Sequence, residues 1–343
     1  MTGASYERQW EARGGRRRAR TTADDSRSSY YGVPPIHKPH WKWLIIIYFF
    51  LGGLSGASYA IAGVADLLGR RADRRIVRAG VYVSFAALLP CPILLILDLG
   101  RPERFLYMFR VLKLRSPMSV GTWALTLFGA FCTLSALIQA AHDGLLGRHN
   151  RAARLLAALP ARAIGAAGAG PAFLVAGYTG VLLAATAVPL WTKSFMLMGP
   201  LFITSAASNA TAAIALLLSL SRGTSRRTLH SLEKLDALLL AGEALLLLAT
   251  WARLGRVIAR PLHTGRLGLL NGAVVLGLGI AVPLVIQLTT LLAGSTAQPL
   301  ATGFASVCVL TGGFAFRYVM VMAGRASADD PQATFDLTKS RLP

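Results

Sequence analysis

Charged residues are scarce in this sequence, and acidic ones most of all. Only 15% of the 343 residues are charged, with 15 Asp and Glu against 36 Lys and Arg, while 54% are hydrophobic. A single soluble core needs far fewer apolar residues than this. The composition therefore excludes an ordinary soluble domain and favours a chain whose main solvent is lipid.

Potential metal ligands are few and scattered. The cysteines Cys91, Cys132 and Cys308 stand alone in apolar stretches and form no CxxC pair, which argues against an iron–sulfur cluster, a structural zinc or a disulfide framework. The six histidines lie in the N-terminal segment, in expected loops or at expected span ends, whereas a membrane haem b needs histidines facing each other within helices. We expect no haem, no iron–sulfur cluster and no metal site in this chain.

Apolar windows of helical length recur through most of the chain. Spanning a bilayer takes about 20 mostly apolar residues per helix, and backbone amides in lipid must be satisfied within a helix or a closed barrel. These windows are too long for barrel strands. We therefore expect an all-α integral membrane protein with about eight transmembrane helices in a bundle. The expected spans are 41–65, 76–97, 120–141, 171–191, 195–220, 235–252, 267–292 and 300–323.

The polar segments complete the expected organisation. Residues 1–40 form a basic tail that we expect to be disordered, residues 41–323 the membrane domain, and residues 324–343 a C-terminal tail. The first apolar run follows the basic cluster only at Leu44 and is a full span, so we expect no cleavable export signal. Residues 151–170 could form an interfacial amphipathic helix. The net charge of +21 falls in the tail and the breaks between spans, which indicates membrane lipid and not nucleic acid as the partner of these cations.

Three polar residues of the expected spans suggest a proton path. Glu243 lies near the middle of the sixth span, Asp236 lies seven residues earlier on a similar helix face, and Asn209 belongs to a polar stripe on the fifth span. The alternative is structural. Glu243 would then be a buried acid that is protonated or paired with Arg317, and Asn209 would simply form an interhelical hydrogen bond.

The segment Asp98-Leu-Gly-Arg-Pro-Glu-Arg-Phe105 ends the second span with two acids and two arginines. Gly100 and Pro102 terminate the helix, which leaves Asp98 just within the apolar zone. Flanked by arginines and aromatic residues, this carboxylate could accept protons from a quinol at the interface. A capped helix end with a structural salt bridge is the alternative.

This motif is followed by Ser116-Pro-Met-Ser-Val-Gly-Thr-Trp123, which opens the third span. The two motifs together resemble the NrfD/PsrC-like family of polysulfide, nitrite and related reductase membrane subunits. Further segments agree with the family in order along the chain. They are 30–34, 41–43, 48–53, 178–180, 189–191 and 313–318.

The resemblance implies two four-helix bundles without a redox cofactor of their own. Such a subunit binds a quinone, menaquinone or ubiquinone, near one membrane face and docks a multi-cluster iron–sulfur subunit there, which in turn joins a molybdopterin or multihaem catalytic subunit. Carried over to this sequence, Asp98 would be the catalytic proton acceptor. The quinone contacts would be Asp98, Arg101, Trp41 and His40, with His37 as an alternative to His40. Glu103 and Arg104 are assigned to the partner interface.

The orientation in the membrane follows from the resemblance alone. Lys and Arg flank the two sides in nearly equal numbers, so the positive-inside rule is indecisive. The resemblance places both termini on the periplasmic side of the bacterial cytoplasmic (inner) membrane. Our leading interpretation is a quinone-binding membrane subunit that exchanges electrons with an iron–sulfur partner, with possible proton movement. A secondary transporter and a purely structural anchor without quinone are the alternatives.

Overall fold

The protein is described by a computed structural model that places residues 36, 39–69, 73–147, 150–221, 223–293 and 297–339. Within these ranges the chain folds into helices without any strand. Eight helical segments are long and apolar enough to cross a membrane, which confirms the expected fold class and number of spans. The spans are Trp43–Leu68, Arg74–Asp98, Pro117–His142, Ala161–Ala184, Phe195–Leu220, Arg226–Ile258, Gly265–Leu292 and Pro299–Asp329. The tail expected over 1–40 lies almost entirely outside the described residues.

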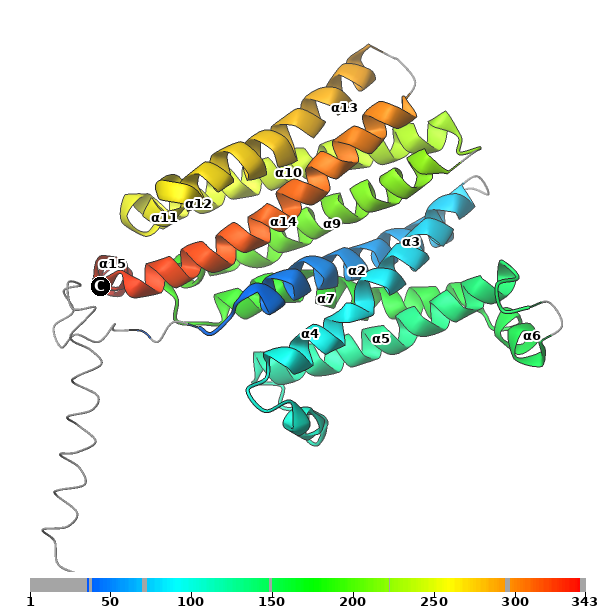
Figure 1. Ribbon diagram of the computed structural model, residues 1–343, viewed down its shortest axis with the longest axis horizontal. Helices are drawn as coiled ribbons and strands as arrows, with labels where there is room; N and C mark the ends of the chain where they lie inside the picture. Colours follow the sequence, from blue (N-terminus) through cyan, green and yellow to red (C-terminus); the bar gives the residue numbers. More distant parts are fainter. Residues whose placement is uncertain are drawn as a thin grey trace, which may run out of the picture.

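The first four spans form one group of helices, which we call the first bundle. It contains α2 (Trp43–Leu68), α3 (Arg74–Leu88) with its continuation α4 (Pro90–Asp98), α5 (Pro117–His142) and α7 (Ala161–Ala184). α2 packs against α3, α4 and α7, and α5 packs against α3 and α7. In Figure 1 this group lies below the central helices, with α4 and α5 farthest from the rest.

The last four spans form the second bundle. It contains α9 (Phe195–Leu220), α10 (Arg226–Ile258), the η3–α13 segment (Leu270–Ala281 and Val282–Leu292) and α14 (Pro299–Asp329). α9 and α14 lie at the centre of the molecule and contact α2, so they join the two bundles (Figure 1). The shorter elements are η2 (Pro102–Phe109), α6 (Arg151–Ala157), α8 (Pro189–Lys193), α11 (Arg260–His263), α12 (Gly265–Leu269) and α15 (Pro331–Lys339).

Small residues allow the helices around α7 to approach closely. A Cβ added to Gly56 of α2 would overlap the backbone of Ala172 and Ala176 on α7. A Cβ at Gly180 of α7 would likewise overlap the Met198 carbonyl of α9. Lipid tails are as apolar as the side chains, so close packing of backbones replaces the hydrophobic effect as the force that holds these helices together.

The fourth span was predicted ten residues too late. Its helix α7 begins at Ala161, contains Pro171 in its interior and ends at Ala184, while Pro189 opens the separate short helix α8. A proline inside a membrane helix is tolerated because neighbouring helices satisfy the freed carbonyl. The short helix α6 does precede this span, but it ends at Ala157, and half of the stretch expected to lie at the interface, 161–170, belongs to the span itself.

Two further differences concern the second bundle. α10 begins at Arg226 and not near 235, which brings His230 and Glu233 into the helix. The segment η3 is a π-helix within the seventh span, where Gly279 meets Gly312 of α14. A nearly uniform apolar run has no periodicity that distinguishes a π-helix from an α-helix, so sequence reasoning could not find it. Past the eighth span, the segment assigned to a C-terminal tail folds into α15.

Candidate functional site

A cavity of about 430 Å³ opens at one end of the first bundle, where the second span finishes. It lies between α2, α3, α4, η2, α5 and α7. Its wall is mostly apolar, and Asp98 is the single charged side chain among its lining residues. A largely apolar cavity of a few hundred Å³ with few polar groups is the usual form of a small-molecule site.

Aromatic side chains make up much of this cavity, which we call the Asp98 pocket. They are Trp41, Tyr48, Phe49, Phe85, Phe105, Phe109 and Tyr178. Phe105 and Phe109 of η2 meet edge to face, with ring centroids 6.5 Å apart. Phe109 meets Trp123 of α5 in the same way, at 6.2 Å. These contacts hold η2 over the end of α5, so the 3₁₀ helix forms part of the pocket wall.

Asp98 and two residues before α2, His40 and Trp41, lie near one another at this end. Asp98 is half-buried and makes no hydrogen bond or salt bridge with any other described residue. His40 is exposed and is its electrostatic neighbour. Trp41 lines the pocket itself. The structural salt bridge considered as an alternative for Asp98 is therefore not formed within the described part of the chain.

Trp41 is held firmly by the second bundle. Its indole stacks on that of Trp191, with ring centroids 5.5 Å apart, and Trp191 is completely buried. The Nη1 of Arg325, on α14, donates a hydrogen bond of 3.2 Å to the Trp41 carbonyl. Trp191 in turn donates from Nε1 to the Met320 carbonyl of α14 at 2.9 Å. One wall of the Asp98 pocket is thus fixed by residues more than a hundred positions away in the sequence.

The other residues of the aspartate motif do not enter the pocket. Arg101, Glu103 and Arg104 are exposed and are absent from its lining. Arg101 precedes η2, and Pro102 is the first residue of that helix. The structure therefore separates Asp98, which faces the cavity, from three charged residues on the outer surface.

Sequence reasoning missed Tyr48, Tyr178 and Gly121 as parts of the site. Tyr178 of α7 donates a hydrogen bond of 2.6 Å from its hydroxyl to the Pro117 carbonyl, which ties α7 to the start of α5. A Cβ on Gly121 would overlap the Tyr178 ring. All three residues belong to segments that carry the family resemblance, so the signal was present, but only the fold shows that they line one cavity.

A second cavity of about 500 Å³ lies at the opposite end of the same bundle. Arg74, Arg162, Asp66 and His142 are among its lining residues, and Tyr59 is its single aromatic residue apart from His142. The guanidinium of Arg162 lies 3.8 Å from the Asp66 carboxylate. This polar lining makes it a poorer candidate for an aromatic ligand than the Asp98 pocket.

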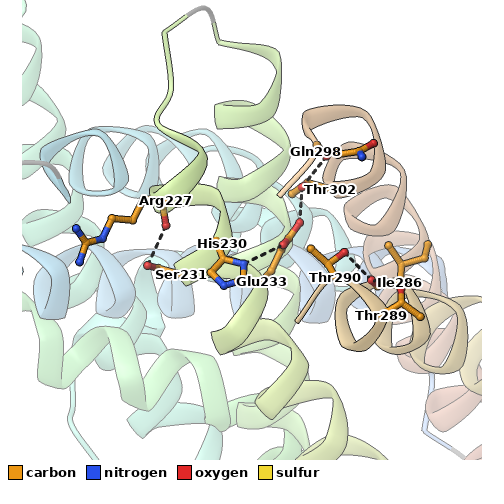
Figure 2. Close-up of polar contacts among 9 residues, drawn as sticks. All are labelled: Arg227, His230, Ser231, Glu233, Ile286, Thr289, Thr290, Gln298 and Thr302. Atoms are coloured by element: carbon orange, nitrogen blue, oxygen red, sulfur yellow. Dashed lines mark hydrogen bonds and ion pairs between the residues drawn. The ribbon is translucent and has the colours of Figure 1, made fainter. Parts of the chain in front are cut away.

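The acids of α10 form a buried polar column inside the second bundle. Asp236 accepts hydrogen bonds from the Ser208 hydroxyl at 2.7 Å and from Gln287 Nε2 at 2.6 Å. Glu233, which was expected outside the membrane, is also buried and accepts a hydrogen bond from the Thr302 hydroxyl (Figure 2). Each acid therefore has a partner on a different helix of the bundle.

Glu243 lies deeper along the same helix and is the electrostatic partner of Arg317. Arg317 is only 1% exposed, and its guanidinium lies 5.7 Å from the Phe202 ring centroid and 5.3 Å from that of Phe316. In the described part of the chain, Glu243 and Arg317 form no ion pair within 4 Å, and the Arg317 charge acts on the Glu243 carboxyl only at longer range. This interaction does not exclude a role in proton transfer.

Asn209 takes a different place from the one expected. Its Nδ2 donates to the Ser205 carbonyl one turn earlier on α9, at 2.6 Å, and the side chain packs where a Cβ on Gly313 would lie. It makes no hydrogen bond to Asp236 or Glu243. The structure brings Asp236 and Glu243 to one helix face and leaves Asn209 beside them, bonded within its own helix.

No group of three or more His, Cys, Asp or Glu residues that could hold a metal ion occurs in the described ranges. The cysteines Cys91, Cys132 and Cys308 are buried and free.

Comparison with known proteins places the chain in a family. Residues 35–328 match the family described as Polysulphide reductase, NrfD. Over 88 residues the chain is 26% identical to a subunit of the selenate reductase of Mesobacillus selenatarsenatis. That match covers 26% of this chain and only 20% of the relative's length. The family match spans most of the chain and all eight membrane helices. This multi-pass membrane protein therefore belongs to the NrfD family.

Proposed function

We propose that this chain is the quinone-binding membrane subunit of a multi-subunit oxidoreductase and that the Asp98 pocket is its quinone site. Its family, and its similarity to a subunit of selenate reductase, support the role of membrane subunit. One observation carries the proposed quinone site. Asp98, a carboxylate without a hydrogen bond to any described residue, lies on the wall of an apolar, aromatic cavity at the end of a membrane span.

The lining residues fit a quinone. Phe85, Phe105 and Tyr178 supply flat apolar surface for an aromatic ring. Gly121 leaves room on α5 for the Tyr178 ring. A bound quinone or quinol would supply two-electron chemistry that is coupled to two protons. The cavity volume of about 430 Å³ is within the range of small-molecule sites.

Asp98 and His40 would transfer the protons that the quinol releases. The Asp98 carboxylate is placed to accept a proton from a hydroxyl group in the cavity, because it is the single charged group on the cavity wall. His40 is exposed next to it and connects this carboxylate with water outside the membrane. Trp41, held by Trp191 and Arg325, closes the cavity between these groups and the second bundle.

The exposed charges beside the pocket fit a partner interface. Arg101, Glu103 and Arg104 lie on the outer surface at this end, and Leu106 and Tyr107 of η2 are exposed next to them. We propose that a multi-cluster, ferredoxin-like iron–sulfur subunit docks here and exchanges electrons with the quinone. A molybdopterin or multihaem catalytic subunit would be joined through that partner. We place Arg101 on this surface and not in the quinone site.

The location follows from the same proposal. The segment before α2 and the C-terminal helix α15 lie at the end of the molecule where α4 finishes (Figure 1). We propose that this end faces the periplasm and that the protein spans the bacterial cytoplasmic membrane.

Binding of a fluorescent quinol-analogue inhibitor to the purified full chain tests the quinone site. We expect saturable quenching with the wild type and weaker binding with Asp98→Asn. Glu103→Gln is the matched control, because this exposed acid lies five residues away and does not line the cavity.

Three other outcomes would count against the quinone site. Equal binding by the wild type and Asp98→Asn would place the ligand elsewhere. No binding by folded wild type, alone and within its complex, would favour a structural anchor. Substrate flux in liposomes without any redox partner would favour a secondary transporter.

A further inference from the structure

A very small polar cavity lies in the second bundle, between α10, α13 and α14. Its volume is about 10 Å³, and its polar lining consists of Glu233, Asp236, Gln287, Thr302 and Ser306. A cavity must offer about 10–15 Å³ to hold one water molecule, and the water needs two to four polar partners. At about 10 Å³ this cavity has the smallest volume that admits one water molecule, and its lining supplies more than enough polar partners.

Two buried oxygen atoms at this cavity lack a partner. Glu233 Oε2 and Gln287 Oε1 make no hydrogen bond with the described residues, although each side chain belongs to a residue only 4% exposed. Their other polar atoms are engaged, since Glu233 Oε1 accepts from Thr302 and Gln287 Nε2 donates to Asp236. Leaving a buried acceptor unsatisfied is costly. Gln287 Oε1 therefore calls for a donor from a small molecule in the cavity, while Glu233 Oε2 can be served by such a molecule or by His230 Nδ1, a buried atom that also lacks a hydrogen bond.

His230 connects this cavity with the membrane surface. Its side chain is 28% exposed, and Nδ1 lies 3.9 Å from Glu233 Oε2, one turn away on α10. Figure 2 shows the imidazole on one side of Glu233 and Thr302 on the other. The surface concerned is at the start of α10, the end of the molecule opposite the Asp98 pocket (Figure 1).

The inner end of the column is closed by a positive charge. Glu243 lies ten residues beyond Glu233, about 15 Å along the helix at 1.5 Å per residue. There it meets Arg317, whose Nη1 donates to Ser205 Oγ at 2.6 Å. α9 and α13 contain no charged residue, so Arg317 is the charge that faces this column from the neighbouring spans. A fixed arginine repels an approaching proton and acts as an electrostatic barrier.

We propose that the cavity holds one water molecule and that His230, Glu233, this water and Asp236 form a proton intake that opens only on the face opposite the Asp98 pocket. A proton held on Glu233 passes to the water while the water gives one of its own protons to Asp236, so the water is regenerated. The intake ends at Glu243 and Arg317, so in the absence of electron transfer the second bundle holds protons and does not form an open channel. This inference does not depend on quinone binding.

Infrared spectroscopy of the full chain in lipid nanodiscs tests the intake without any quinone or partner. The carboxyl band that disappears in Asp236→Asn is assigned to Asp236, and its exchange is followed after transfer to D₂O. We expect exchange within the mixing time in the wild type. We expect strong slowing in Glu233→Gln, which keeps an acceptor for Thr302 but cannot carry the proton, and in Ala305→Val, which fills the cavity.

Ala301→Val is the matched control for the second variant, because Ala301 lies one turn away on α14 and does not line the cavity. In Ala301→Val, the Asp236 carboxyl group should exchange with D₂O as fast as in the wild type. Unchanged exchange in folded Glu233→Gln would overturn the proposal, whatever Ala305→Val does. A shift of the Asp236 band on addition of sodium chloride, absent with choline chloride, would also overturn it and would identify the occupant as Na⁺.

Discussion

Arg317 of α14 donates a hydrogen bond of 2.6 Å from Nη1 to the hydroxyl of Ser205 on α9. The same guanidinium group donates to the Gly313 carbonyl at 3.0 Å and lies against Phe202 and Phe316. A Cβ on Gly53 of α2 would lie 3.7 Å from Arg317 Nη2, so this charge occupies the junction of the two bundles. Its nearest counter-charge is Glu243.

Replacing Arg317 by Met should therefore destabilise the protein strongly. It removes the hydrogen bonds of the guanidinium group to Ser205 and Gly313. It also leaves the buried Glu243 carboxyl without the positive charge that acts on it. The double variant Arg317→Met with Glu243→Gln should recover part of this loss, because neither charge is then left unpaired. Thermal unfolding of the purified chain in detergent measures both effects. If the double variant is no more stable than Arg317→Met alone, the two side chains do not act as a pair.

A methyl group at Gly121 should weaken binding of the quinol analogue. The new Cβ of Gly121→Ala would overlap the Tyr178 ring and push it into the Asp98 pocket. Gly129→Ala is the control in the same helix and the same pocket wall, since its Cβ would meet only Leu88 Cδ2 at 3.9 Å, an ordinary contact. Inhibitor titration should separate the two variants. Equal loss of affinity in both would contradict the assigned role of Tyr178.

The contact between Gly279 of η3 and Gly312 of α14 should be sensitive to a single methyl group. Each added Cβ would overlap the backbone of the other glycine, and overpacking of this kind costs about 1–3 kcal/mol. Gly272→Ala, in the same π-helix, has nothing within 4 Å of its Cβ and should be tolerated. Melting temperatures of Gly279→Ala and Gly272→Ala compare the two sites. A stable Gly279→Ala protein would mean that η3 and α14 are not this close.

Glu243→Gln should lower the number of protons moved per electron in the assembled complex. The amide cannot be protonated, so the store at the inner end of the column is lost, while quinol oxidation at the Asp98 pocket should continue in uncoupled vesicles. The measurement is the proton-to-electron ratio in vesicles, compared with that of the wild-type complex. An unchanged ratio would rule against proton movement through α10.

The ion pair between Lys193 and Asp336 should matter little. Nζ lies 3.0 Å from Oδ2, but both side chains reach water, and such pairs contribute about 0–1 kcal/mol. Lys193→Gln should leave the melting temperature nearly unchanged at high salt, where exposed charges are screened. A large loss would instead indicate that docking of α15 on α8 depends on this contact.

The aspartate motif shows which features of the site the local sequence can predict and which it cannot. Its order of acid, glycine and proline predicted that the second span ends at Asp98, and the helix α4 does end there. The same motif gave no means to separate Asp98, which faces the cavity, from Arg101, which does not. That choice depends on how η2 folds back over α5, where Phe109 of η2 contacts Trp123.

For Glu233, the structure differs from what the sequence predicts. The sixth span expected from the sequence begins at residue 235, which leaves Glu233 outside it. The structure extends α10 to Arg226 and satisfies Glu233 with Thr302 of α14. A helix can carry polar residues at membrane depth when other helices supply their hydrogen bonds, and hydropathy along one segment does not contain that information.

The sequence by itself determined that the chain lies in a membrane and how many spans it has, because long apolar runs in lipid are stable only as helices. It also determined the family, because the short motifs occur in the family's order. Only the tertiary structure decided which residues share a cavity and which buried acids have partners. Those contacts join helices from distant parts of the chain, as Gln287 and Asp236 do, and the distance between two such side chains is set by packing and not by their separation in sequence.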